Sequence, residues 1–230
     1  MFKRYKSKMF CFSPPVMLAT FLFEFGAAFY TIWRYKMTTV TRLAVMILLA
    51  LGTFQLAEYM ICGGLGWTNV EWARLGYAAI TVLPPLGIHM LVALSGKKKP
   101  LLVSLAYVTG AAFLAFYVFV QSAIGAQECH PNYAVFHTSN DLAWLYGVYY
   151  YGWLVTGTLL AVRWAGEMPK RKKALMGMAF GYLVFIIPTT FFNLVDPSTI
   201  KGIPSIMCGF AVLLAAALIF IVLPNSSKKR

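Results

Sequence analysis

The sequence predicts an all-α, polytopic membrane protein built as one bundle of seven transmembrane helices. Hydrophobic residues make up 60% of the 230 residues, and the mean hydropathy of +0.71 lies far above the usual range of soluble proteins. Seven stretches are each long and apolar enough for a span, which needs about 20 largely apolar residues. They cover residues 12–33, 41–62, 72–95, 100–122, 141–164, 174–195 and 203–223. The connections are too short to fold alone, so we expect a single seven-helix membrane domain over residues 1–230.

Four of these spans contain features that need an explanation. The first follows a basic segment, as a signal peptide does, but no small-residue cleavage site follows it, so we expect a retained helix. Pro84-Pro85 and Pro188 lie inside the third and sixth spans, where membrane helices tolerate kinks. The fifth contains three consecutive tyrosines at 149–151. They cannot all face lipid, so at least one phenol is expected to point into the bundle and to need a partner.

The distribution of basic residues predicts the orientation. Fourteen of the 20 Lys and Arg residues follow spans one, three, five and seven, and six lie on the other side. The positive-inside rule then places the C-terminus in the cytoplasm and the N-terminus outside a cell membrane, as a multi-pass protein. The basic residues near Met1 oppose this assignment, and a true start at Met9 would remove most of them. Since these cations flank spans, we expect them to meet the lipid bilayer, and we expect no nucleic-acid partner despite the net charge of +13.

Polar residues inside spans are the candidate ligand-binding site, because charged groups in a bilayer are costly and often functional. Glu24 lies near the middle of the first span, and Gln55 and Glu58 lie three residues apart on one face of the second. We expect these two to face the bundle in its outer half, with Tyr149 and Tyr150 closing a polar pocket around them. Two readings stay open, namely a ligand pocket and hydrogen-bonded helix glue.

The histidines give weaker signals. His89, after the Pro84-Pro85 kink, is expected to be structural. The outer loop 123–140 lacks Lys and Arg and contains Cys129, His130 and His137, which with Asp141 supply zinc-binding atom types at a spacing typical of no zinc motif. We expect this loop to form an outer cap with loops 63–71 and 196–202. No metal, no cofactor and no catalytic residue is predicted.

The four cysteines fall on the predicted outer side. Cys11 and Cys62 lie at the outer ends of the first two spans, Cys129 lies in the outer loop, and Cys208 lies just inside the last span. An oxidising outer space would favour disulfides. Of the three possible pairings, Cys62–Cys129 is the first choice, and Cys11–Cys208 would tie the first span to the last. The alternative is that they are small apolar residues.

Four short motifs in order carry a family resemblance. They are Cys11-Phe12-Ser13, Phe54-Gln55-x-x-Glu58, Leu83-Pro84-Pro85 and Ser205-x-x-Cys208. The chain resembles an uncharacterised family of small prokaryotic seven-transmembrane proteins beginning with Cys-Phe-Ser, and departs from it at Pro14-Pro15 and Met207. More distantly, residues 72–94 and 202–220 resemble the N-terminal seven-helix input region of sensor histidine kinases. That family has no assigned activity, so the resemblance implies none. The expected outer cap, polar outer pocket and basic cytoplasmic face together predict a receptor-like architecture.

The functional expectation is therefore binding or sensing, and not catalysis. The ligand would be small or lipidic, and a signalling partner protein is the other possible partner. The competing reading is an intramembrane enzyme or redox protein that uses Glu58, Cys11, Cys208 or the His-bearing outer loop. A transporter ranks third, because no inverted repeat is visible.

Overall fold

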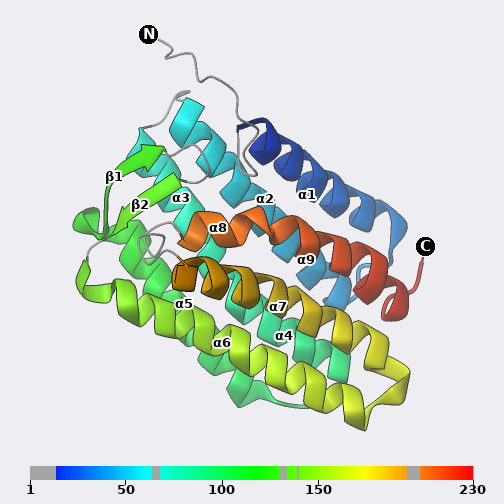
Figure 1. Cartoon of the computed structure of the whole chain (residues 1–230). Coiled ribbons are helices and arrows are strands. Elements are labelled where there is room, and N and C mark those ends of the chain that lie inside the picture. The colour runs from blue at the N-terminus through cyan, green and yellow to red at the C-terminus, as the bar shows by residue number, and fades with distance from the viewer. Residues whose placement is uncertain (1–13, 64–67, 130–133, 139, 196–202, 230) are drawn as a thin grey trace.

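The fold is almost entirely helical (Figure 1). The computed structural model describes residues 14–63, 68–129, 134–138, 140–195 and 203–229. The helices are α1 (Pro14–Arg34), α2 (Thr39–Gly63), α3 (Asn69–Thr81), α4 (Leu83–Ser95), α5 (Pro100–Phe119), α6 (Asn140–Glu167), α7 (Lys172–Val195), α8 (Ile203–Gly209) and α9 (Ala211–Ala217). The last helix continues through a π turn at Leu218–Val222 and a 3₁₀ turn at Leu223–Asn225. The predicted all-α class is confirmed.

Six helical stretches in the described residues are long and apolar enough to cross a membrane, as expected for a multi-pass membrane protein. They are Pro15–Arg34, Thr39–Ile61, Asn69–Ser95, Pro100–Phe119, Pro169–Val195 and Ile203–Asn225. The sequence predicted seven. The missing one is α6, which is 28 residues long and covers the predicted span 141–164. Its tyrosines, tryptophans and glycines lower its hydropathy relative to these six stretches.

The third predicted span is broken into α3 and α4 by two prolines. Pro84 and Pro85 have no N–H to donate, so α3 ends at Thr81 and α4 restarts after Val82. Pro85 would otherwise have donated to the Thr81 carbonyl, four residues earlier. That carbonyl instead accepts a hydrogen bond from the Tyr149 hydroxyl on α6, at 2.6 Å. One phenol of the tyrosine run thus points into the bundle, as predicted, and it supplies the hydrogen bond that the Thr81 carbonyl lacks at the kink.

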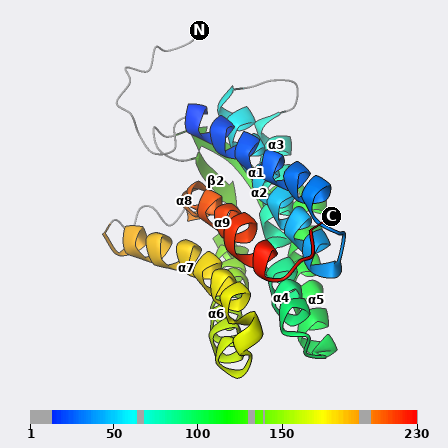
Figure 2. The same cartoon turned by 90° about the vertical axis from the view of Figure 1, so that its right-hand side faces the viewer.

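The helices divide into central and peripheral ones (Figure 2). The apolar windows of α2 and of α3–α4 are 67% and 72% buried, whereas those of α1 and α5 are 28% and 17% buried. Glycines permit close approach in the centre. A Cβ on Gly181 of α7 would lie 2.4 Å from Leu214 Cδ1, and one on Gly177 would lie 2.9 Å from Ile221 Cγ2. Small residues four apart allow such helix contacts in membranes.

A β-hairpin occupies the predicted outer loop, for which no strands were predicted. Strand β1 (Ile124–Cys129) pairs antiparallel with β2 (Ala134–Thr138), with an irregularity between Ile124 and Gln127. The hairpin lies at the end of the bundle where α2 ends and α3 begins (Figure 1). Its strands are short and one is bulged, so neither shows a clear alternation of apolar and polar residues.

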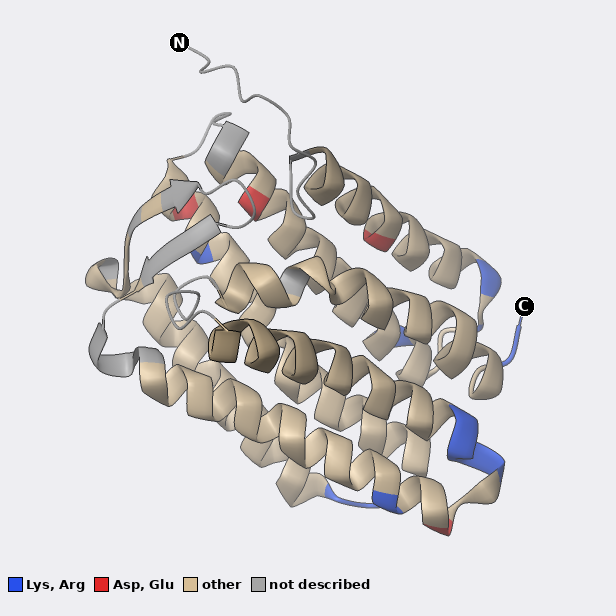
Figure 3. Ribbon diagram, in the orientation of Figure 1, with Lys and Arg blue, Asp and Glu red and all other residues tan. Residues whose placement is uncertain are grey.

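Basic residues gather at the opposite end (Figure 3). Two segments far apart in the sequence meet there: Lys36 N donates to Lys228 O at 3.0 Å, and Tyr35 pairs with Lys229 in an isolated antiparallel bridge. The C-terminal tail therefore lies against the link between α1 and α2. We call this end of the molecule the basic end. The described Lys and Arg residues there belong to the set that was counted for the predicted cytoplasmic side.

Candidate functional site

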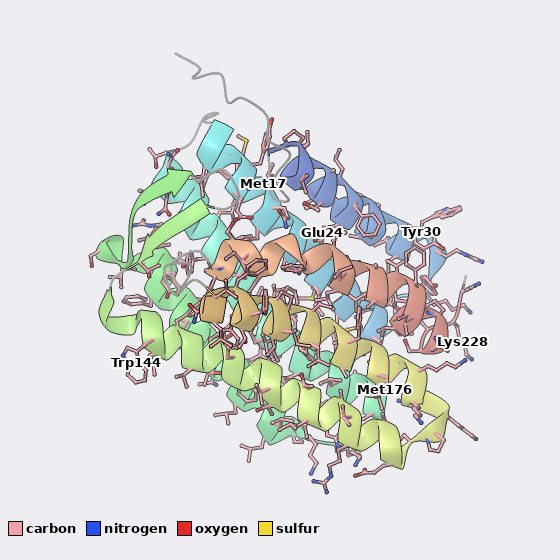
Figure 4. The ribbon with its side chains drawn as sticks, viewed as in Figure 1. Met17, Glu24, Tyr30, Trp144, Met176 and Lys228 are labelled. Atoms are coloured by element: carbon pink, nitrogen blue, oxygen red, sulfur yellow. The ribbon has the colours of Figure 1, made fainter. Side chains whose placement is uncertain are left out.

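The in-span polar residues are buried, as predicted for Gln55 and Glu58. The exposed fractions are 0% for Glu24, 2% for Gln55 and 1% for Glu58. Glu24 lies on the face of α1 that packs on α2 (Figure 4), where an added Cβ on Gly52 would lie 3.5 Å from Glu24 Cβ. Gln55 and Glu58 continue along α2 from that point. We call Glu24, Gln55, Glu58 and Ser205 the acidic seam.

Helix α1 offers Glu24 no donor of its own. The neighbouring buried hydroxyls on the same face donate to carbonyls of their own helix. Thr20 Oγ1 bonds Met17 O at 2.9 Å, and Thr31 Oγ1 bonds Ala27 O at 2.7 Å. Both carboxyl oxygens of Glu24 are buried and have no hydrogen-bond partner among the described residues.

Glu58 is partly satisfied by α8. The Ser205 hydroxyl forms a hydrogen bond with the Glu58 carboxyl group, while Glu58 Oε1 is buried without a partner in the described part of the chain. Glu24 and Glu58 are near enough to interact electrostatically. Ser205 belongs to one of the four sequence motifs, but its hydrogen bond with Glu58 was not predicted. A hydroxyl three residues before Cys208 carries no pattern that would predict it.

Among the described residues, no Lys or Arg is classed as buried alongside these carboxyl groups. The buried polar side chains of the described residues are Thr, Ser, Gln and Glu, with no Lys, Arg or His among them. An ionised carboxylate buried without a counter-charge is costly. The Glu24 carboxyl, and the Glu58 oxygen without a partner, are therefore either protonated or stabilised by a donor or cation that the described residues do not supply.

The span-five tyrosines take part in an aromatic cluster. Tyr149 and Tyr150 are 7% and 6% exposed. The Tyr149 phenol donates to Thr81 O, and the Tyr146 phenol lies 3.1 Å from Thr81 Oγ1. Tyr146 also packs against Tyr77, Tyr117 and Phe113. Tyr149 thus bonds to α3, and the Glu58 carboxyl bonds to Ser205 of α8.

The remaining predicted residues contribute less. His89 is partly buried and its Nδ1 lies 3.1 Å from the Tyr107 hydroxyl of α5, which fits the structural role expected of it. Cys11 and His130 lie outside the described residues, as do the side chains of Cys62, Cys129, His137, Asp141 and Cys208. The disulfide pairings and the zinc alternative stay predictions. Within the described residues, no group of three or more His, Cys, Asp or Glu could hold a metal ion.

The comparisons with known proteins identify no relative of this chain. No protein-family model matches the chain, and no curated protein matches it. The resemblance drawn from the four motifs, and the more distant one to sensor kinase input regions, therefore stay predictions. What can be said of function comes from the buried carboxyl groups and their surroundings.

Proposed function

We propose that this chain is a seven-span protein of the cell membrane that binds a small or lipidic ligand at the acidic seam, in a receptor or sensor role. The observation that carries the proposal is Glu24. Its two carboxyl oxygens are fully buried, and none of the described residues supplies a hydrogen bond to them. A ligand with an ammonium, amine or hydroxyl group would supply the missing donor.

The seventh span in this proposal is α6. It is 28 residues long, which at about 1.5 Å per residue exceeds the hydrocarbon thickness of a bilayer. It packs along α7, which is apolar enough to span by itself. With seven spans and the basic end in the cytoplasm, the N-terminus and the hairpin face outside. Glu58 then lies roughly 8 Å below the outer end of α2, five residues before its last residue.

The outer disulfide belongs to the same proposal. Cys62 is in the last turn of α2 and Cys129 ends β1, and these two elements are in contact. A link between them would tie the hairpin to the bundle above the seam, and Cys11–Cys208 would be the second link. Peptide mapping without reduction, under thiol blocking, is expected to find Cys62 joined to Cys129. Four free thiols would contradict it.

The seam is tested with charge-removing variants that keep side-chain shape. The protein is purified gently, and native mass spectrometry reports which small molecules remain bound to wild type, Glu24→Gln, Glu58→Gln and Glu167→Gln. Glu167 is the matched control, since it lies at the basic end and pairs with Lys97 and Arg163. Wild type and Glu167→Gln are expected to retain the same ligand, and the two seam variants are expected to lose or exchange it. Equal retention by all four proteins would make the seam structural glue.

The same experiment addresses the enzyme alternative. The hydrogen bond between Ser205 and the Glu58 carboxyl is the observation in favour of it, because a carboxylate can accept the proton of a hydroxyl nucleophile. A retained ligand of constant mass supports binding. Conversion of the retained molecule over time in wild type, stopped by Ser205→Ala, would instead support catalysis.

A further inference from the structure

A cavity that shares no residue with the acidic seam opens at the basic end. Its volume is about 680 Å³. It lies between the start of α2, the C-terminal half of α4, the start of α7 and the C-terminal tail, and so it joins four segments far apart in the sequence. The sequence analysis did not predict it. Its lining divides into a polar mouth and an apolar wall.

The mouth of the cavity is cationic. Lys97, Lys170 and Arg171 line it. Lys97 is occupied, because its ammonium pairs with Glu167 and lies 5.4 Å from the centroid of the Trp164 ring. Arg171 Nη1 donates to the carbonyl of Leu94 and keeps its other donors. Lys170 makes no ion pair with any described residue, so its charge is available to a ligand.

The start of α2 adds uncharged donors to the same mouth. Thr38, Thr39 and Val40 line the cavity, and α2 begins at Thr39. Thr38 caps the helix, since its carbonyl accepts from Arg42 N at 2.9 Å and its hydroxyl accepts from Thr41 N. The backbone N–H groups of Thr39 and Val40 lie in the first turn, where they have no partner within the helix. Such N–H groups favour an anion, particularly a phosphate, when cations stand beside them.

The wall of the cavity is apolar and deep. Val92, Ala93 and Leu94 of α4 line it with Ala174 of α7. His89, which also lines it, is seven residues from Gly96 at the mouth, so the cavity follows α4 for roughly 10 Å toward the middle of the bundle. A small inorganic ion would leave most of this wall uncovered. An ester with an apolar portion would cover it.

We propose that this cavity binds the phosphate group of an anionic ester, with the headgroup of an anionic phospholipid as its source. The Lys170 ammonium, the free donors of Arg171 and the first N–H groups of α2 hold the phosphate. The glycerol and upper acyl carbons lie along Val92, Ala93 and Ala174. Free phosphate shares the recognition chemistry but not the contact with the wall, and that difference separates the two sources.

The experiment measures retention of single lipids by the full chain in uncharged detergent micelles. Phosphatidylglycerol is the probe, phosphatidylcholine the comparison and inorganic phosphate the competitor, with bound lipid counted by native mass spectrometry. Lys170→Gln removes the cation without an ion pair, and Ala93→Phe fills the space beside the apolar wall. Lys98→Gln is the matched control, because Lys98 is exposed next to Lys97 but does not line the cavity. Arg171 is left unchanged, since it also holds the Leu94 carbonyl.

Lys170→Gln is expected to weaken phosphatidylglycerol binding about fivefold, and Ala93→Phe about tenfold or more, the steric cost being larger. Lys98→Gln is expected to change it less than about twofold at physiological salt. Thermal unfolding of each variant checks that it folds. Displacement of the lipid by millimolar phosphate, with unchanged phosphate binding in Ala93→Phe, would identify a free anion as the source. Equal losses in Lys98→Gln and Lys170→Gln, or no loss in either cavity variant, would overturn the site.

Discussion

The acidic seam and the basic end hold carboxyl groups in opposite ways. At the basic end, the Glu167 side chain is 41% exposed and pairs with Lys97 and with Arg163, whose Nε lies 3.2 Å from it. In the seam, Glu24 and Glu58 are buried and no Lys or Arg of the described residues is buried with them. Water and cations make a carboxylate inexpensive at the surface. Inside the bundle the same group has no such support, so it lowers stability unless something binds it.

The largest effect is expected from removing the unpartnered carboxyl group. Glu24→Leu keeps the approximate volume and removes a buried polar group that lacks a donor among the described residues. In protein freed of ligand, it is expected to raise the free energy of unfolding by about 1–3 kcal/mol. Chemical denaturation in detergent measures this, with Glu167→Leu as the control that is expected to give no gain. A loss of stability in Glu24→Leu would show that Glu24 has a partner in the folded chain.

The second effect concerns the one hydrogen bond that the seam does possess. Ser205→Ala removes the donor to the Glu58 carboxyl and leaves a buried acceptor without it. The expected cost is about 1–2 kcal/mol. Ser226→Ala at the basic end is the control, because its hydroxyl donates to the Val222 carbonyl of its own helix in an exposed setting. If both serine variants lose the same amount, burial of Glu58 does not distinguish the two regions.

A third prediction tests the same rule with phenols in place of carboxyl groups. The Tyr149 hydroxyl fills the gap left at Thr81 O by Pro85, whereas the Tyr182 hydroxyl is buried without a hydrogen-bond partner among the described residues. Tyr149→Phe is expected to cost about 1 kcal/mol. Tyr182→Phe is expected to be neutral or slightly stabilising, since it removes an unsatisfied polar atom. The reverse order of the two unfolding midpoints would contradict the rule.

The positions of the helices could be predicted from the sequence because the bilayer fixes the apolar length of a span. The second span was predicted over residues 41–62 and α2 covers Thr39–Gly63. The last was predicted over 203–223, and the helical stretch covers Ile203–Asn225. The hairpin escaped prediction, since its pairing depends on a turn between short strands. Helix α6 is less apolar than the other predicted spans, because its tyrosines pack in the aromatic cluster.

The site could be predicted only as far as single helices allow. The i, i+3 spacing of Gln55 and Glu58 places them on one face, and the cost of exposing a carboxyl to lipid turns that face inward. No local sequence pattern predicts that Ser205 of α8 forms a hydrogen bond with Glu58. Nor does one predict that the Tyr149 hydroxyl donates to the Thr81 carbonyl of α3. The cavity at the basic end is farther still from prediction, because Thr38, Lys170 and Ser226 come together only in the folded bundle.

The smallest effect is expected at the exposed carboxylate. The pKa of Glu167 lies below its usual range, chiefly because Lys97 donates a hydrogen bond to it and then because Arg163 does. A lowered folded-state pKa contributes stability above the ordinary carboxyl pKa of about 4.3, and this contribution is lost as the pH falls through the folded-state value. Since Glu167 is exposed, solvent and salt screen the contribution. Glu167→Gln is therefore expected to lower the unfolding midpoint by less than about 2 °C at pH 7. The difference from wild type is expected to shrink at high salt and to vanish at acid pH below the folded-state value. A Glu167→Gln loss as large as that of Ser205→Ala, and insensitive to salt, would remove the contrast between the two regions.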